Sequence, residues 1–324
     1  AMSNSIDRRS FLAGAGLAVA GPGGTAQTAP STVQFGLIAD VHHGLMPDAH
    51  HRLDSFLAEV NRRSPDFIMQ LGDFCHPKPE SRAFLRSWHS FRGPKHNVLG
   101  NHDMDHGTKS QIMELWEMPK NYYSFDLCGF HFIVLDCNYL NMPGGYVDFA
   151  NSNYFGTGWR RDWVNPEQLE WLRADLRAAA LPTIVFTHQC VGPFWAKDAH
   201  VNRSAVKAIL TATNEESGWQ KVVACFSGHH HTDHHAELAG VNYLLVNSAS
   251  YYWVGEEYGS LAKYRSPLFT FVTLNPSGQI RIEGRRSEFL APTPTELHHP
   301  DAAHVTASIQ ERQIRFQPRT KRSG

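Results

Sequence analysis

The chain has 324 residues, of which 42% are hydrophobic and 19% are charged, and its formal net charge is −1. This composition is ordinary for a soluble globular protein with one large core or two smaller ones. Because the charges nearly cancel, we expect neither a nucleic acid polymer as a partner nor a stable membrane association. The chain also contains 20 histidines, an unusually high number of side chains that bind transition metals.

The first 30 residues resemble an export signal rather than part of a folded domain. The segment IDRRSFL at residues 6–12 is similar to the twin-arginine motif, although Ala13 stands where that motif usually has a lysine. The apolar stretch from Phe11 to Ala20 is too short to span a bilayer. We therefore expect twin-arginine export to the periplasm or the exterior, with the cleavage point open between Ala20 and Ala29.

The next part of the chain alternates between strand-like and helix-like patterns. Short apolar runs at residues 33–39, 66–71 and 97–99 are typical of buried strands. Between them, residues 50–63 and 81–91 have apolar side chains at the helical period. This β-α-β-α-β order favours parallel strands that are covered by helices.

Further strands and helices follow, with one long irregular segment among them. We expect strands at 122–126, 130–136, 183–187, 222–226, 243–246, 268–274 and 280–283, and helices at 112–116, 166–180 and 204–211. Turns at Gly129 and at residues 275–278 join two pairs of these strands into hairpins. Residues 141–163 show no clear period and are a candidate substrate-facing loop.

The end of the chain differs in composition from the part before it. From about residue 291 it becomes polar, then rich in proline, and finally basic, which indicates a loosely attached tail. We therefore divide the chain into an export signal at 1–30, one globular domain at 31–290 and a tail at 291–324.

Side chains that bind metals follow five of the predicted strands. They are Asp40 and His42, Asp73, Asn101, His188, and His229 with His231. If the strands lie side by side, these side chains converge at one edge of a sheet. Carboxylate, amide and imidazole ligands without a thiolate suit Mn, Fe or Zn better than they suit a structural zinc site.

The five strand ends, taken in this order, resemble the calcineurin-like metallophosphoesterase superfamily, which includes purple acid phosphatases, Ser/Thr protein phosphatases and class III cyclic-nucleotide phosphodiesterases. The resemblance covers Val33 to Glu283. It implies an α/β fold, a four-layer α/β/β/α sandwich with a dinuclear metal site where the strands have their carboxyl ends. One departure follows Asp73, because relatives often have an acidic residue three positions on and this chain has His76.

The resemblance also implies a ligand set for two divalent or trivalent transition metal ions. Asp40, His42, Asp73 and His231 would bind one ion, and Asp73 would bridge to a second ion held by Asn101, His188 and His229. Such a pair of ions, about 3.5–4 Å apart, binds phosphoryl oxygens and supplies a bridging hydroxide that attacks phosphorus. We expect His102 to protonate the leaving oxygen or hold the phosphate, and Asp103 to orient the His102 ring.

The expected function is hydrolysis of a phosphoric monoester or diester, by a phosphatase or phosphodiesterase acting on a small nucleotide-type or other phosphoester. A non-catalytic interaction module with the same fold is an alternative, but such a module is expected to lack ligands, and none is missing here. The substrate, the metals and the oligomeric state stay open.

The histidine cluster allows a second alternative. Residues two apart in an extended segment point the same way, so His229 and His231 can serve the two metals while His230 points elsewhere. Residues 229–234 also fit the His-x-His-x-Asp-His signature of the metallo-β-lactamase superfamily, a different binuclear hydrolase. In that superfamily the motif lies in the first half of the domain, whereas here it comes late.

Several other residues are weaker candidates for contact with a substrate. They are Tyr251, Tyr252 and Trp253, His43 and His106, Asn138, and Trp159, Arg160 and Arg161. Aromatic rings stack on bases and arginines bind phosphates, but ordinary packing or a solvated loop charge also explains each of these residues.

Overall fold

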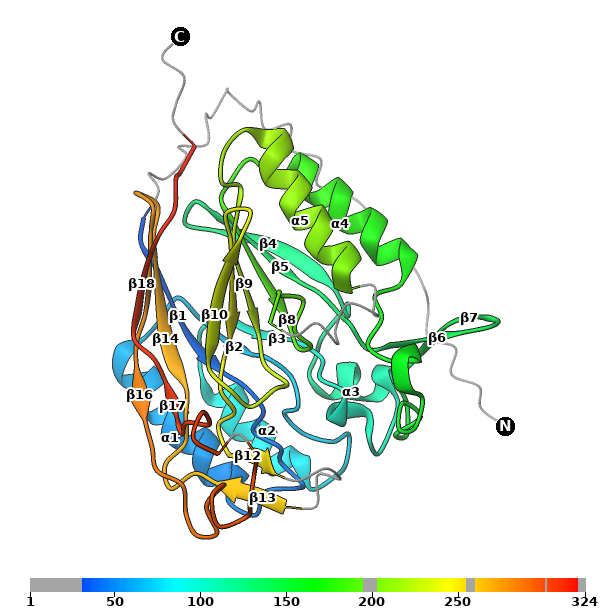
Figure 1. Cartoon of the computed structure of the whole chain (residues 1–324), viewed down its shortest axis with the longest axis vertical. Coiled ribbons are helices and arrows are strands. Elements are labelled where there is room, and N and C mark those ends of the chain that lie inside the picture. The colour runs from blue at the N-terminus through cyan, green and yellow to red at the C-terminus, as the bar shows by residue number, and fades with distance from the viewer. Residues whose placement is uncertain (1–30, 195–202, 255–259, 301, 320–324) are drawn as a thin grey trace, which may run out of the picture.

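Two six-stranded β-sheets face each other in the part of the chain that the computed structural model describes, which is residues 31–194, 203–254, 260–300 and 302–319 (Figure 1). The first sheet contains, in spatial order, β18 (Arg312–Arg315), β15 (Gln279–Ile282), β14 (Thr270–Asn275), β1 (Val33–Ile38), β2 (Phe67–Gln70) and β3 (Lys95–Asn97). The second contains β10 (His234–Leu238), β11 (Val241–Leu245), β9 (Val222–Ser227), β8 (Thr183–Thr187), β5 (Phe130–Val134) and β4 (Tyr123–Leu127). The predicted export signal lies outside the described residues.

Helices cover the outer face of each sheet, as Figure 1 shows for α4 and α5 beside the second sheet. The helices are α1 (Ala49–Arg63), α2 (Ser81–Ser90), α3 (Lys109–Leu115), α4 (Pro166–Ala178) and α5 (Arg203–Ser217), with short 3-10 helices η1 (His102–Met104) and η2 (Gly158–Arg160). Small strand pairs are β6 (Tyr139–Met142) with β7 (Gly145–Asp148), β12 (Tyr251–Val254) with β13 (Ser260–Lys263), and β16 (Arg285–Arg286) with β17 (Ser308–Ile309).

The core is divided into three apolar layers. Apolar side chains of α1 and α2 pack on the outer face of the first sheet, and those of α4 and α5 pack on the second. Between the sheets, Phe35 stacks on Phe67 with ring centroids 4.7 Å apart. Phe35 also meets Phe132, Phe186 and Phe226 of the second sheet edge to face, a favourable arrangement of aromatic rings. The predicted four-layer α/β/β/α sandwich is confirmed.

The parallel strands bring the predicted site residues to one place. In the first sheet β1, β2 and β3 are parallel, and in the second β5, β8, β9 and β11 are parallel. Apart from β3, these strands are buried on both faces, which explains why their sequences are largely apolar runs. The segments that follow β1, β2, β3, β8 and β9 therefore meet at one edge of the sandwich.

Each helix and strand expected from the sequence has a counterpart in the structure, with shifts of a few residues at the ends. The long irregular segment is more ordered than expected, because it contains β7 and η2. Helix α4 begins at Pro166, as its sequence predicts, and the Gln168 N–H donates a 3.0 Å hydrogen bond to the side chain of Asn165. None of the helices in the described part of the chain combines the length and apolar character that crossing a membrane requires.

The prediction of a loosely attached tail is wrong for residues 308–316. Strand β18 pairs with β15 at the edge of the first sheet, and β17 pairs with β16. Ile314 and Phe316 are buried in the core between the sheets. Only alternate side chains of this edge strand face the core, so charged residues separate the apolar ones and conceal the strand in the sequence.

Candidate metal centre

The backbone around the predicted ligands adopts a conformation that residues other than glycine rarely adopt. Asp40, His42, Asp73, His229 and His231 all have positive φ angles, between 49° and 70°. Left-handed backbone costs free energy in such residues, and it occurs where the surrounding structure enforces it, most often at functional sites. The expectation that residues 229–231 are extended is therefore wrong, although His229 and His231 still serve different groups of side chains.

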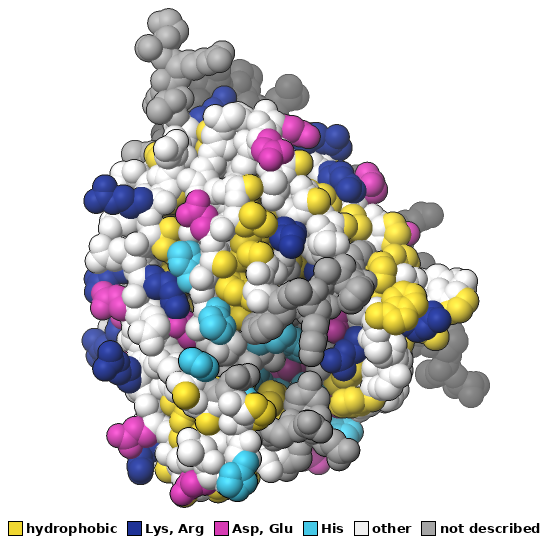
Figure 2. Space-filling view, in the orientation of Figure 1, with side chains coloured by type: hydrophobic (Ala, Val, Ile, Leu, Met, Phe, Trp, Pro, Cys, Tyr) yellow, Lys and Arg dark blue, Asp and Glu magenta, His cyan; other side chains and the backbone are white. Residues whose placement is uncertain are grey.

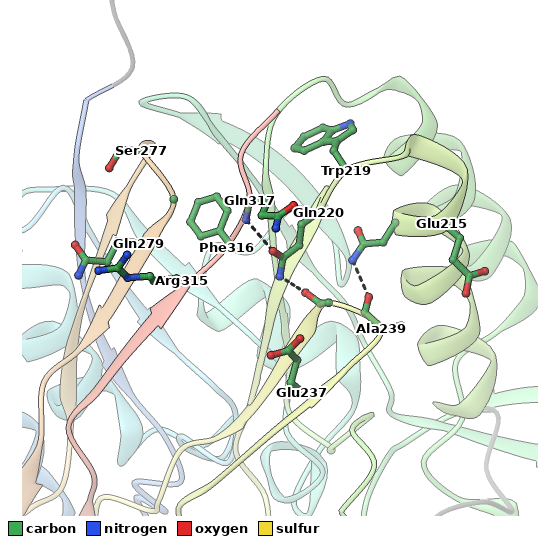
Figure 3. Close-up of a pocket in the computed structure, with 13 residues that line it drawn as sticks. Glu215, Trp219, Gln220, Glu237, Ala239, Ser277, Gln279, Arg315, Phe316 and Gln317 are labelled. Carbon is green, nitrogen blue, oxygen red and sulfur yellow. Dashed lines mark hydrogen bonds between the residues drawn. The ribbon is translucent and has the colours of Figure 1, made fainter. Parts of the chain in front are cut away.

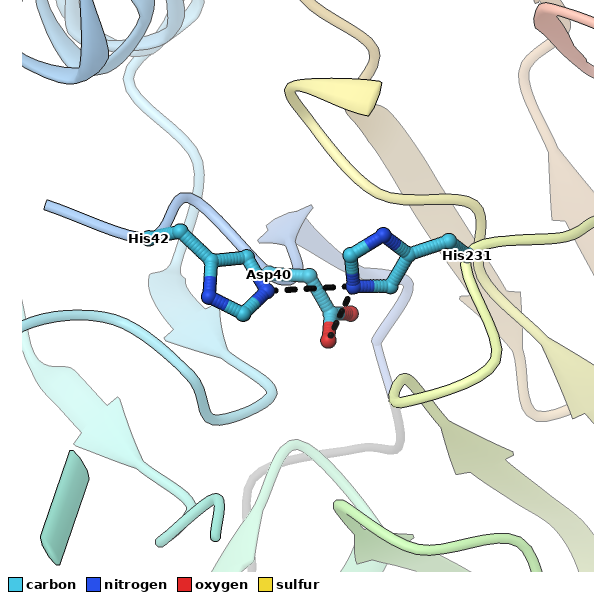
Figure 4. A group of neighbouring side chains, drawn as sticks. All are labelled: Asp40, His42 and His231. Atoms are coloured by element: carbon cyan, nitrogen blue, oxygen red, sulfur yellow. Dashed lines mark hydrogen bonds and ion pairs between the residues drawn. The ribbon is translucent and has the colours of Figure 1, made fainter. Parts of the chain in front are cut away.

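The first group consists of Asp40, His42 and His231 (Figure 4). The Nε2 atoms of His42 and His231 are 3.1 Å apart, and His231 Nε2 is 3.3 Å from Asp40 Oδ1. The three side chains are almost fully buried. The donor atoms point toward one another, as Figure 4 shows, which is the arrangement that a shared cation requires.

The second group consists of Asp73, His188 and His229, with Asn101 beside it. Asp73 Oδ2 lies 3.1 Å from His188 Nε2, and His188 Nε2 lies 3.2 Å from both Asn101 Oδ1 and His229 Nδ1. The structure thus brings together every ligand predicted for the second ion. Their role in binding a metal stays a prediction.

Asp73 links the two groups. Its Oδ2 atom is also 3.8 Å from His42 Nε2, so the carboxylate faces the first group as well as the second. Glycine is required at two of the strand ends, one beside Asp40 and one beside Asp73. A Cβ on Gly228 would lie 2.6 Å from Asp40 Oδ2, and a Cβ on Gly100 would collide with the Asp73 backbone and carboxylate.

The hydrogen bonds of the histidines fit metal ligands. His188 Nδ1 lies 2.7 Å from the Leu71 carbonyl and His231 Nδ1 lies 2.8 Å from the Tyr251 carbonyl, so in each ring Nδ1 donates and Nε2 keeps its lone pair for the centre. Burial lowers the pKa of His42 well below its usual range, which keeps that ring in the neutral form that binds metals.

The charges at the centre also fit cations. Burial acts to raise the pKa of Asp73, but His188 and His102 outweigh it and hold this pKa well below its usual range. For His188, burial acts to lower the pKa and the Asp73 carboxylate raises it to about 10, so without a cation Nε2 carries a proton that a bound metal ion would displace. The buried carboxylates therefore attract positive charge strongly, and the donor set is one that Mn, Fe or Zn accepts. The residues present fit two metal ions.

His102 lies beside the two groups but belongs to neither. Its backbone N–H donates a 2.8 Å hydrogen bond to Asp73 Oδ1, which ties the start of η1 to the shared ligand. Its Nδ1 lies 2.6 Å from Asp105 Oδ2. The Tyr154 hydroxyl donates a 2.5 Å hydrogen bond to Asp105 Oδ1, and the Ser152 hydroxyl donates one of 3.1 Å to the same atom. Asp105 is thus held in place behind the His102 ring.

The prediction that Asp103 orients the His102 ring is wrong. The carboxylate of Asp103 accepts hydrogen bonds of 2.7 to 3.0 Å from four backbone N–H groups. These donors belong to Asp73, Phe74, Cys75 and Gly100. Successive residues of the 3-10 turn point in different directions, so Asp103 faces the strand ends while Asp105, three residues after His102, faces the ring. Asp103 joins the loops after β2 and β3.

A cavity of about 630 Å³ opens beside the centre. Its lining includes Asp73, Asn101, His102, His229 and His230, two arginines (Arg161 and Arg203), and the apolar or aromatic side chains Leu45, Tyr154, Phe155, Tyr252 and Trp253. His230 belongs to neither candidate metal group, as predicted, yet it does line the cavity. Figure 2 shows histidine side chains gathered near the middle of the face that Figure 1 presents.

The weaker candidates divide between the cavity and the body of the protein. Tyr252, Trp253 and Arg161 line the cavity. His43 stacks on Phe84 instead, with ring centroids 4.4 Å apart. Three other candidates also lie away from the cavity. His106 packs against His76, and the Asn138 side chain donates a hydrogen bond to the Leu99 carbonyl. The ring of Trp159 is covered by the Arg160 guanidinium.

The metallo-β-lactamase alternative does not fit the structure. Asp233 faces away from the centre, where its carboxylate binds Arg312 at 2.6 Å and accepts a hydrogen bond from Gln310 N. His234, the last residue of the signature, is exposed at the start of strand β10.

A larger cavity, of about 1070 Å³, lies between the β10–β11 turn, the β14–β15 turn and the end of β18 (Figure 3). Among the described residues that line it, none is a predicted ligand. Two of its polar side chains are engaged with the chain itself, since Gln220 accepts a hydrogen bond from Gln317 N and Asn214 donates one to Ala239 O. This cavity separates the two sheets at their far end.

Sequence reasoning missed Asp105, Tyr154, Phe155 and Arg203. A signal for Asp105 was present, because residues three apart lie on the same side of a helical turn and Asp105 follows His102 by three. Tyr154 and Phe155 lie in the segment expected to face the substrate, but nothing in its aperiodic sequence singles them out.

Comparison with known proteins gives two kinds of likeness. Residues 33–233 match the calcineurin-like phosphoesterase family. The fold is similar to that of a dimetal phosphatase from zebrafish (Danio rerio), with a TM-score of 0.60 and 15% identity over 88% of this chain and 99% of that chain. It is also similar to GAP50, the anchor in the inner membrane complex of Plasmodium, with a TM-score of 0.50 and 13% identity over 90% of each chain. No curated protein sequence matches the chain significantly.

The likeness to these two structures concerns the fold alone, because the identities are low. The family match is independent of it and covers more than half of the chain. It includes all five strand ends, from Asp40 to His231, and also His102. The chain therefore belongs to the calcineurin-like phosphoesterase family.

Proposed function

We propose that the protein is a metal-dependent phosphoric ester hydrolase that acts on small phosphoesters, nucleotide-type compounds among them. The observation that carries this proposal is the convergence of two buried ligand groups on Asp73, with His102 beside them and an open cavity in front. A non-catalytic member of the family has no need for a complete donor set in strained backbone next to such a cavity.

Asp40, His42 and His231 would hold one ion, Asn101, His188 and His229 would hold the other, and Asp73 would contact both. When bound, two such ions supply Lewis acidity toward the phosphoryl oxygens and a nucleophile from water. The chain itself orients the ligands through the carbonyls of Leu71 and Tyr251 and excludes water from the buried side of the centre.

His102 is the group that we expect to give a proton to the leaving oxygen. Because Nδ1 is bound to Asp105, Nε2 is the nitrogen left for the substrate. Burial acts to lower the pKa of His102, but Asp73 and Asp105 outweigh it and raise this pKa, which favours the protonated form. A protonated ring beside the phosphorus site serves as a general acid or binds the phosphate.

The size of the cavity supports a small substrate. A volume of about 630 Å³ lies within the usual range for sites that bind small molecules. The walls carry both arginines and aromatic rings, which suits an anionic ester with an organic group attached.

The twin-arginine-like segment supports action outside the cytoplasm. Fractionation of cells that express the full chain with Arg8 and Arg9 changed to lysine tests that location.

An assay with p-nitrophenyl phosphate and bis-p-nitrophenyl phosphate tests the activity. We expect hydrolysis of at least one ester, loss of that activity in a chelator, and recovery when Mn is added. Arg265→Ala, a change at an exposed side chain that does not line the cavity, serves as the control for losses during purification and assay. Failure of metal-replete protein to hydrolyse any ester in a broad panel would contradict the proposal and favour the interaction module.

A further inference from the structure

We propose that the leaving group of the substrate carries a planar ring, aromatic or heteroaromatic, which lies against Phe155 and Trp253 beside His102. This inference rests on the proposed function. It identifies the side of the cavity that determines which substrates bind. Esters of nucleosides and of phenols belong to this class, whereas esters of simple alkyl alcohols do not.

The position of the two rings carries the inference. The His102 ring centroid is 6.2 Å from that of Phe155 and 6.1 Å from that of Trp253, and all three side chains line the cavity. A residue that protonates a leaving oxygen must contact that oxygen, so the rest of the leaving group extends into the space beside it. That space is bounded by aromatic rings.

Phe155 is exposed, yet it is held firmly. Its side chain is 56% exposed, while Tyr154 beneath it is buried and stacks on it with centroids 4.6 Å apart. Tyr154 in turn stacks on the buried Phe149 at 4.7 Å and donates its hydroxyl hydrogen to Asp105. A row of three stacked rings therefore runs from the core to the cavity and fixes Phe155 next to His102.

An exposed phenylalanine by itself means little, since single apolar side chains are common on protein surfaces. Trp159 provides the comparison within this chain. It is also 56% exposed and lies close to Phe155 in sequence, but it does not line the cavity and a guanidinium covers its ring. Phe155 differs because one face of its ring stacks on Tyr154 and the ring lies beside His102 in the cavity lining. Its other face is therefore available to the substrate.

Trp253 bounds the space from the metal side. Its ring is 5.7 Å from the His231 ring and 6.2 Å from the His42 ring, so it also shields two predicted ligands. Substitution of Trp253 would therefore disturb the centre as well as the substrate. Phe155 contacts no predicted ligand in the described structure, which makes it the residue to change.

The test compares two esters whose leaving alcohols are equally acidic, phenyl phosphate and a fluorinated alkyl phosphate, on metal-replete protein. Base stacking on an aromatic side chain contributes about 1–3 kcal/mol, so we expect Phe155→Ala to lower the ratio of kcat/KM for the ring ester to that for the alkyl ester by about 5-fold or more. Phe155→Tyr should retain the ratio, Phe155→Leu should lower it, and Trp159→Ala should leave it unchanged.

A binding measurement separates this inference from the proposed function. Calorimetry with phenylphosphonate and propylphosphonate, neither of which is hydrolysed, gives the affinity of the same site without turnover. Selective binding of the phenyl compound, lost in Phe155→Ala, supports the ring site even if no ester is hydrolysed. Equal affinities for the two phosphonates and an unchanged kcat/KM ratio in Phe155→Ala would overturn the inference while leaving the hydrolase proposal intact.

Discussion

Nδ1 of His102 lies 2.6 Å from Oδ2 of Asp105, a residue from the same helical turn. The Asp105 carboxylate is the acidic partner of the ring in this structure, whereas His76, three residues after Asp73, packs against His106. Asp105 fixes the orientation of His102 and the nitrogen that faces the substrate.

Asp105→Asn should slow turnover by about 10- to 100-fold, the usual effect of losing a hydrogen-bond partner behind a functional histidine. Metal content should stay unchanged, because the Asp105 carboxylate is hydrogen-bonded to His102, Tyr154 and Ser152, none of which is a predicted metal ligand. The measurement is kcat on esters with good and poor leaving groups, and the loss should be larger for poor ones. Ser152→Ala is the matched control, because it removes the hydroxyl that donates to the carboxylate and the backbone carbonyl of Asp105 but keeps the carboxylate itself. An equal loss on both kinds of ester would contradict this role.

Asp103→Ala should affect stability rather than acid catalysis. The change leaves four buried backbone N–H groups without their acceptor, so we expect a loss of roughly 3 kcal/mol or more in the free energy of unfolding. Urea unfolding of the metal-free protein measures it, with the exposed Asp54→Ala as the control. A variant as stable as the parent but slow in turnover would restore the role that the sequence suggested for Asp103.

Ile314→Ala should destabilise the protein, because β18 is part of the first sheet. Ile314 is 8% exposed and packs in the core between the sheets, where removal of a large apolar side chain costs about 2–5 kcal/mol. Gln313→Ala, on the exposed face of the same strand, should change the free energy of unfolding by less than about 0.5 kcal/mol. Equal, small effects in urea unfolding would mean that the segment is a loose tail after all.

The ion pairs of His131 should stabilise the folded protein to a degree that depends on pH. Its Nδ1 is 2.5 Å from Asp126 and its Nε2 is 2.8 Å from Asp175 of α4. Burial acts to lower the pKa of His131, but Asp175 and Asp126 outweigh it and raise this pKa in the folded protein. Because this pKa is raised, the ion pairs of His131 stabilise the folded protein fully at pH values below the pKa of histidine in the unfolded chain, about 6.5. That stabilisation is lost as the pH rises through the pKa of His131 in the folded protein.

The melting temperature of His131→Gln should therefore fall further below that of the parent at about pH 6 than at about pH 9. The effect should be modest, because Asp126 is largely exposed to solvent. His51→Gln, at an exposed position of α1, controls for the loss of a histidine. A difference in melting temperature that does not change with pH would show that His131 is not charged in the folded state.

The ligands were predictable because each follows a strand whose apolar run is easy to recognise. Asp40 and Asp73 come directly after such runs, and parallel strands bring their ends together regardless of the loops between them. Asp105 was not predictable in the same way. Its spacing of three residues from His102 favours it only if a helical turn forms there, and the sequence around residues 101–105 does not by itself predict η1.

The remaining differences concern residues whose environment is created by distant parts of the chain. Ile314 and Phe316 lie among charged residues in the sequence, and only pairing with β15 turns them toward the core. Phe155 lies in an aperiodic segment, and its place beside His102 depends on the stacking of Tyr154 on Phe149. Local patterns carry no information about either arrangement.

The metal content of the protein and of Asp73→Asn tests the central claim most directly. If the two ligand groups share Asp73, metal analysis of the purified protein should find two ions per chain, and the variant should hold fewer than one. His231→Ala and His229→Ala should each retain about one ion, because each belongs to a single group. An Asp73→Asn variant that keeps two ions, or a parent protein that binds only one, would contradict a dinuclear centre built on this carboxylate.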